Sequence, residues 1–375
     1  MSINRRSGAH RRDQVPLRIV ALRFDLETSP QKIEQQLIAF LRELRWKARG
    51  FDPADLEAAR EADRWSEELL ACCPSQHDGE RIHRRAKALA DRRIRASGLG
   101  HLDKDAREKL RGLSDGVRVV QLPSAHRADE IAATLHEEMP WMAQATTLAW
   151  HAMRESVRNG APALHLPPML LDGPPGVGKS YWARRLAELI GTPSELIDAA
   201  NEPAGFAVAG SQRGWATAQP GRLVELILRD HVGNPVMVID EIDKVGNVCS
   251  NKGMSFALSN ALLPLLEPLS AQAWSCPYFR VTFDMRWISW ILTSNNRRNV
   301  PAPLLSRCRV VDVPPLSGAY LAHFARREGA ARGLSADAIA TLAAMLEGSS
   351  HRLDLRAVIK LIDSLCGHEN SPITH

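Results

Sequence analysis

Short apolar runs that alternate with longer amphipathic segments characterise the middle of the chain. Three of these runs are typical of buried strands, and they lie at residues 169–171, 236–239 and 287–293. Apolar residues recur with helical spacing over 142–158, 181–190 and 221–228. Strands that alternate with helices are typical of a parallel sheet covered by helices on both faces. The pattern therefore predicts an α/β domain, which we place at residues 128–312.

The N-terminal region, residues 1–127, has a different pattern. Residues 17–24 alternate partly between apolar and polar positions, which suits an exposed strand. Polar helices are predicted from Ser29 through Leu41, over 55–70 and over 79–95. Because this region is rich in charged residues and poor in large apolar ones, we predict a mainly helical accessory region with no recognisable chemistry.

The C-terminal region, residues 313–375, is also helical by pattern. Pro314 and Pro315 indicate a hinge at its start. Helical periodicity follows over 319–328, 336–346 and 353–366. We predict a small helical lid that follows the α/β domain.

Composition limits the class of protein. The chain has 375 residues, with 45% hydrophobic and 24% charged residues, as in ordinary soluble globular proteins. No apolar run approaches the ~18 residues of a membrane helix, and the N-terminus lacks the apolar core of a secretory signal. The six cysteines have neither metal-ligand spacing nor the density of a disulfide scaffold. We therefore expect a cytoplasmic protein of two or three domains with reduced thiols and no membrane partner.

The charge balance leaves the kind of partner open. The net charge is +5 and the isoelectric point is about 9.0, which tolerates nucleic acid or acidic partners without requiring them. Arg5, Arg6, Arg11 and Arg12 form a basic arm at the N-terminus. Two interpretations remain, a solvated tail and a nucleic-acid-binding arm.

A glycine-rich segment follows the first central strand and opens a predicted helix. It fits the phosphate-binding pattern G-x-x-x-x-G-K-[ST] at every position. Its residues are Gly173, Pro174, Pro175, Gly176, Val177, Gly178, Lys179 and Ser180. In such a loop, backbone N–H groups surround the phosphates and the helix N-terminus adds partial positive charge. We expect Lys179 to reach the β- and γ-phosphates of a nucleoside triphosphate, and the Ser180 hydroxyl to bind Mg²⁺.

Polar residues end the other two central strands. Asp240 and Glu241 follow the apolar run 236–239. Phosphoryl transfer needs a held Mg²⁺ and a water aimed at the γ-phosphorus, so Asp240 suits the metal and Glu241 suits the base. Asn295 follows the third strand, where its amide could contact the γ-phosphate or the water.

Three strings in this order resemble the ATPase domain of Lon-type AAA+ proteins. They are D-E-I-D-K at 240–244, L-L-P-L-L-E-P at 262–268 and P-A-P-L-L-S-R at 301–307. The resemblance covers roughly residues 130 to 365. It implies a P-loop nucleotide hydrolase with Walker A and Walker B motifs and with ATP and Mg²⁺ as cofactors.

The resemblance also implies roles for single residues. Asn295 is expected to be sensor 1, and Arg307 to be the arginine finger that enters the site of a neighbouring subunit. Arg309 is the alternative finger. Arg352 matches the start of the sensor 2 helix, where it is expected to contact the phosphates. A finger that acts on a neighbour implies a closed homo-oligomer, expected to be a hexameric ring.

A glycine-rich and polar segment between the two Walker motifs resembles the first pore loop of Lon. Trp215 occupies its aromatic position, where a large side chain could grip an extended polypeptide through non-directional contacts. Core packing is the alternative for this tryptophan. Residues 246–254 occupy the position of the second pore loop.

The chain also departs from the family. We expect no intrinsic peptidase, because the lid uses the residues that follow Asp312, and we find no match to the Lon substrate-binding domain. The favoured hypothesis is a ring motor that unfolds or remodels polypeptide substrates, with a separate protease as a candidate partner. A nucleic-acid-remodelling or defence-system ATPase is the alternative. A nucleotide-gated scaffold without turnover is the third possibility, and Glu241 argues against it.

Overall fold

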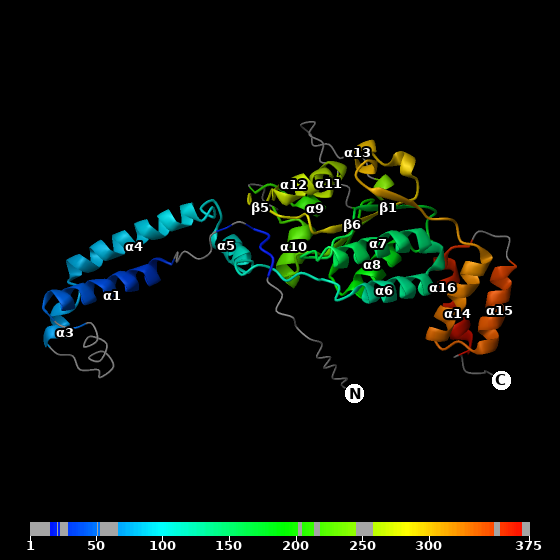
Figure 1. The fold of residues 1–375 in the computed structure, drawn as a ribbon, viewed down its shortest axis with the longest axis horizontal. Coiled ribbons are helices and arrows are strands. Elements are labelled where there is room, and N and C mark those ends of the chain that lie inside the picture. The colour runs from blue at the N-terminus through cyan, green and yellow to red at the C-terminus, as the bar shows by residue number, and fades with distance from the viewer. Residues whose placement is uncertain are drawn as a thin grey trace. The chain divides into compact units, whose positions relative to one another are not determined.

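The computed structural model describes residues 16–20, 22, 29–50, 52, 67–201, 205–213, 218–244, 258–348 and 353–369 (Figure 1). The chain divides into two compact units. Ala21–Ser114 forms the smaller unit, and Met1–Val20 joins Asp115–His375 in the larger one.

A parallel five-stranded sheet organises the larger unit. Its strand order is β2-β3-β6-β1-β7, and every neighbouring pair is parallel. The strands are β1 (Met169–Asp172), β2 (Ser194–Asp198), β3 (Val236–Asp240), β6 (Ser289–Ser294) and β7 (Arg309–Asp312). Sequence pattern predicted β1, β3 and β6, and the structure confirms them together with the α/β class. The pattern missed β2 and β7, which lie at the two edges of the sheet.

Helices flank this sheet on both faces. All residues of the central strand β6 are buried, and successive side chains of a strand point to opposite faces, so both faces are covered there. In this unit the described helices before residue 313 are α6 (Ala125–Glu138), α7 (Ala143–Arg158), α8 (Lys179–Ile190), α9 (Phe206–Ala209), α10 (Arg222–Asp230), α11 (Leu258–Leu266), α12 (Pro268–Gln272) and α13 (Ala302–Leu305). Single 3₁₀ turns lie at Pro140–Met142, Ile242–Lys244 and Arg297–Asn299, and β4 (Trp274–Ser275) pairs with β5 (Thr282–Phe283) in a small antiparallel ribbon.

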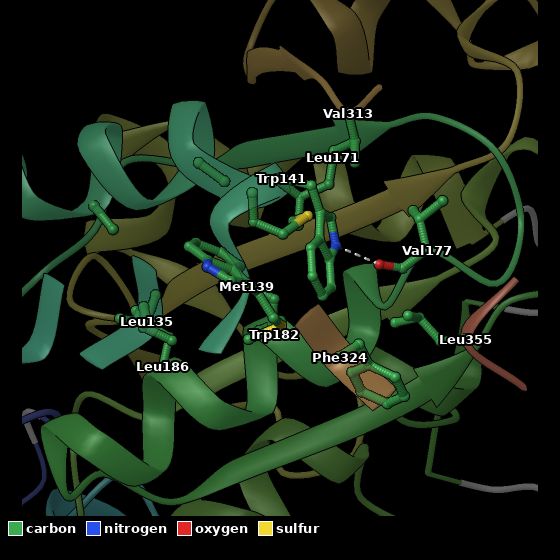
Figure 2. Packing of buried hydrophobic residues seen from close by; sticks show 14 of the residues in the cluster. Leu135, Met139, Trp141, Leu171, Val177, Trp182, Leu186, Val313, Phe324 and Leu355 are labelled. Carbon is green, nitrogen blue, oxygen red and sulfur yellow. Dashed lines mark hydrogen bonds between the residues drawn. The ribbon is translucent and has the colours of Figure 1, made fainter. Parts of the chain in front are cut away.

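Three C-terminal helices share the core of the sheet domain. They are α14 (Gly318–Ala331), α15 (Ala336–Glu347) and α16 (Leu355–Glu369). Figure 2 shows Phe324 of α14 and Leu355 of α16 beside Trp141, in a buried cluster that also contains Leu171 of β1. The Trp141 indole N–H donates to the carbonyl of Val177 at 2.9 Å, so the core also fixes the glycine-rich loop.

The smaller unit is helical. It contains α1 (Pro30–Ala48), α3 (Glu67–Cys72), α4 (Gln76–Ala96) and α5 (Lys104–Arg111). Ser75 begins α4 with a capping box, in which its side chain accepts the Asp78 N–H and the Asp78 side chain accepts the Ser75 N–H. Helices α1 and α4 pack side by side, and Ile33 is buried with Ala86 and Ala90 between them (Figure 1).

Two elements predicted from sequence fall in the N-terminal region. The strand predicted over 17–24 is wrong for the residues described there, because Leu17 and Val20 form only isolated bridges, to Val117 and Phe283. Most of the helix predicted over 55–70 lies outside the described residues. Among the residues that are described, no helix is long and apolar enough to cross a membrane.

Candidate nucleotide-binding site

The glycine-rich loop connects β1 to α8 and is shaped by its glycines. Gly176 and Gly178 have φ angles of 74° and 92°, in the left-handed region that favours glycine. A Cβ atom at Gly176 would lie 2.4 Å from Oδ2 of Asp354. The loop therefore needs glycine there for its backbone conformation and for its close approach to the segment that leads into α16.

Lys179 lies at the centre of the loop and is nearly buried, with 6% of its surface exposed. Its Nζ donates to the carbonyls of Gly173 and Pro174 at 2.7 and 2.8 Å, and to Oδ1 of Asn295 at 3.0 Å. Burial lowers the pKa of Lys179 because it penalises the ammonium form, while nearby carboxylates, chiefly Asp240, oppose this shift. Anionic phosphates would stabilise the same charge, so the site favours a polyanionic ligand.

Ser180 and Asp240 form a pair of oxygen ligands at the carboxyl edge of the sheet. The Ser180 hydroxyl donates to Oδ1 of Asp240 at 2.7 Å, and the Thr293 hydroxyl donates to the same oxygen. Hydroxyl and carboxylate oxygens suit Mg²⁺, which usually takes one or two protein ligands and completes its shell with water and phosphate. The described residues contain no group of three or more histidine, cysteine or acidic side chains that could hold a metal alone. This donor set therefore fits Mg²⁺ bound together with a nucleotide.

Glu241 follows β3 in a left-handed conformation, with a φ of 55°. Such a conformation is unfavourable for a residue with a side chain, and a hydrogen bond from the Glu241 N–H to Oγ1 of Thr293 at 3.1 Å supports it. Its carboxylate accepts from Nζ of Lys244 at 2.6 Å and from Nδ2 of Asn295 at 3.4 Å. The ion pair raises the pKa of Lys244. The sequence pattern alone did not indicate a role for Lys244.

A cavity of about 550 Å³ joins these groups to the C-terminal helices. Its walls include the loop from Pro175 to Ser180, the acids Asp240 and Glu241, and Asn295. Residues of α14 and α16 form the opposite wall: Phe324, Glu328, Leu355, Arg356 and Ile359. The N–H of Leu355 also donates to the carbonyl of Gly176 at 3.1 Å. The cavity has the volume expected of a small-molecule site.

The structure thus brings together the phosphate loop, Asp240, Glu241 and Asn295. Arg352 lies outside the described residues, so its role as sensor 2 stays a prediction. Arg356, the second residue of α16, lines the cavity and was missed. Arg356 lies only four residues after Arg352, but the sequence pattern does not determine which residue at the start of a helix faces the ligand.

Arg307 and Arg309 are not among the residues that line this cavity. The Arg307 guanidinium bonds to the carbonyl of Pro303 at 3.0 Å and pairs with Glu267 at 3.3 Å. Arg309 begins β7 and lines a second cavity of about 500 Å³. Trp215 and residues 246–254 lie outside the described residues, so the pore loops stay predictions.

The parallel sheet and the glycine-rich loop between β1 and α8 define the class of fold, that of a P-loop domain. Residues 169–315 match the family described as ATPase family associated with various cellular activities (AAA). Several similar proteins carry Lon in their names. Lon protease of Desulfovibrio desulfuricans is 31% identical over 172 residues, which is 46% of this chain and 19% of that protein. Lon protease homolog 2, peroxisomal, of Zea mays is 32% identical over 159 residues, 42% of this chain and 17% of the relative.

Lon protease of Lawsonia intracellularis is 32% identical over 159 residues, 42% of this chain and 19% of that protein. The aligned segment thus spans less than a fifth of the length of each of these three relatives. The chain therefore carries an AAA ATPase module of the Lon type, as the resemblance in its sequence indicated.

Proposed function

We propose that the protein is an Mg²⁺-dependent AAA+ ATPase that works as a ring motor and unfolds or remodels polypeptide substrates. The observation that supports this proposal most directly is the connected network at the cavity. Lys179 contacts Asn295, Asn295 contacts Glu241, and Ser180 contacts Asp240. The proposed phosphate-binding lysine, the two proposed Mg²⁺ ligands and the candidate base therefore line one cavity.

In the proposed mechanism each group has one task. Lys179 and the N–H groups of the loop bind the β- and γ-phosphates. Ser180 and Asp240 would hold Mg²⁺, which when bound neutralises charge on the phosphate oxygens. Glu241 orients the attacking water and accepts its proton. Asn295 lies between Lys179 and Glu241, so it can sense the γ-phosphate and position Glu241.

The ring, the substrate and the partners are parts of the same proposal. We assign Arg307 as the finger that enters a neighbouring site in a hexamer, Trp215 as the residue that grips the polypeptide, and a separate protease as a possible partner. The names of the Lon relatives support the polypeptide substrate. Localisation in the cytoplasm is proposed on the composition of the chain.

A trapped ring tests the motor function. Glu241→Gln should bind ATP and retain a fluorescently labelled, chemically unfolded test protein with ATP, and should release it with ADP. Glu225→Gln, which removes the same charge from an exposed position on α10, should cycle as the wild type does. Retention that ignores the nucleotide, or no retention at all, would contradict a polypeptide motor.

Mixed rings test the finger. Arg307→Ala and Lys179→Ala should each be inactive alone, and mixing them should restore part of the ATP hydrolysis, because some sites then combine an intact loop with an intact finger. Arg309→Ala is the matched control and should stay active. Inactivity of Arg309→Ala with activity of Arg307→Ala would move the finger to Arg309.

A further inference from the structure

Helix α4 presents five arginines on one exposed face, which we call the α4 arginine face. They are Arg81, Arg84, Arg85, Arg92 and Arg95. Their separations of three, four and seven residues place them on the same side of an α-helix. The opposite side carries Ala86 and Ala90, which are buried against α1.

Within the described part of the chain, no carboxylate forms an ion pair with any of these five arginines. Nε of Arg84 donates to the backbone carbonyl of Glu80 at 3.4 Å. By contrast, Arg45 on α1 pairs with Asp78 at 2.6 Å. Exposed ion pairs contribute little to stability, so unpaired surface arginines are stable in water. Clustered on one face without neutralising carboxylates, they create a local positive potential that attracts anionic ligands.

We propose that the α4 arginine face binds the phosphate backbone of double-stranded nucleic acid. From Arg81 to Arg95 the face is about 21 Å long, at 1.5 Å per residue. A duplex offers one negative charge per ~1.7 Å of its axis, so several phosphates lie within this length. The planar guanidinium group is suited to two-point contact with phosphate oxygens.

The chemistry of the face distinguishes it from other polyanion sites. A membrane-surface helix inserts an apolar face, but the apolar side of α4 is occupied by α1. Single strands are bound by stacking on aromatic rings, and no aromatic residue lies within Gln76–Ala96 other than His77 and His83. A protein partner needs a central apolar anchor, and this face offers only Ala88. Duplex backbone therefore fits best, independently of the proposed motor function.

The test measures binding of the full chain to a fluorescent duplex DNA of about 30 base pairs over a range of KCl concentrations. The variant carries Arg81→Gln, Arg85→Gln, Arg92→Gln and Arg95→Gln. The control carries Arg5→Gln, Arg6→Gln, Arg11→Gln and Arg12→Gln, which removes the same charge from the N-terminal arm. We expect the α4 variant to lose about 100-fold in affinity at low salt. The slope of log K against log salt concentration should become less steep by about three. The control should keep most of both.

Folding and charge are checked separately. Nucleotide binding and helical circular dichroism should match the wild type in every variant, and Arg85→Gln with Arg92→Gln alone should show about half of the loss in slope. Lysine at the same four positions should retain a steep slope, because it also neutralises phosphate. The proposal would be overturned if the α4 variant and the control lost duplex affinity equally. It would also be overturned if the wild type bound no duplex at low salt. Binding only to vesicles of anionic lipid would overturn it in favour of a membrane.

Discussion

The nucleotide cavity and the α4 arginine face both contain positively charged side chains. The cation of the cavity is buried and fixed by contacts, whereas those of the face are exposed to solvent. Lys179 is nearly buried, and three acceptors hold its ammonium group. The five arginines of the α4 arginine face are exposed, and no described carboxylate forms an ion pair with them. A desolvated, fixed cation suits one ligand in one pose, whereas a row of solvated cations suits a polymer and responds strongly to salt. The difference indicates two binding functions on one chain.

The largest expected effect separates the two sites. Lys179→Ala should weaken ATP binding by about 100-fold, because it removes a charge-assisted contact to the phosphates. Lys360→Ala, at an exposed position of α16, should leave ATP affinity unchanged. Titration calorimetry measures both variants. Duplex binding should be unaffected by Lys179→Ala, and its loss would break the distinction between the sites.

Lys244 is exposed like the α4 arginines but paired like the groups of the cavity. We expect Lys244→Ala to lower ATP turnover by about 10-fold to 100-fold while ATP binding stays unchanged, because Glu241 loses the contact that orients it. Lys244→Arg should retain most of the turnover. Steady-state kinetics measure the effect. Unchanged or faster turnover in Lys244→Ala would show that the pair does not position the base.

The same pair has a defined pH dependence. The pKa of Lys244 is raised in the folded state by its hydrogen bond to Glu241. Its contribution to stability is therefore present below the ordinary lysine pKa and is lost only as the pH rises through the raised value. Across neutral pH Lys244 stays charged, so it should cause no change in turnover there. A lysine-dependent transition near neutral pH would contradict this assignment.

A substitution that alters the backbone shape of the phosphate loop should have a smaller effect than the substitutions that remove charge. Gly176→Ala combines a left-handed φ with a Cβ position 2.4 Å from Asp354, and we expect it to cost about 2 to 3 kcal/mol of stability. Gly191→Ala has a φ of 82° and no atom within 4 Å of the new Cβ, so it should cost only about 1 to 2 kcal/mol. Urea unfolding compares the two. Equal costs would show that contact with Asp354 does not constrain the loop.

The smallest effect is expected at the N-terminal cap of α4, the helix that carries the α4 arginine face. Ser75→Ala removes the capping box of α4 and should lower the stability of the smaller unit by about 1 kcal/mol. Hydrogen exchange of α4 amides should report the change, while ATP turnover stays as in the wild type. An equal increase in exchange throughout the larger unit would show that the two units unfold together.

Sequence predicted the parts of the nucleotide site that depend on strand ends. The Walker A loop, Asp240 and Asn295 were placed correctly in one region because parallel strands deliver their carboxyl ends to one edge. Lys244 and Arg356 were missed, since their contacts depend on a 3₁₀ turn and on the docking of α16, which periodicity does not encode. The edge strand β7 was missed because only Val311 of its four residues is buried.

The hydrolysis of ATP by Glu241→Gln, measured together with ATP binding in the same samples, tests whether Glu241 is the catalytic base of this cavity. We expect wild-type affinity for Mg²⁺·ATP and a fall in turnover of about 100-fold or more, because glutamine orients water but takes no proton. Turnover at the wild-type rate in a variant that binds ATP normally would contradict the assignment of Glu241 as the base. It would also remove the basis for an ATP-driven motor built on this cavity.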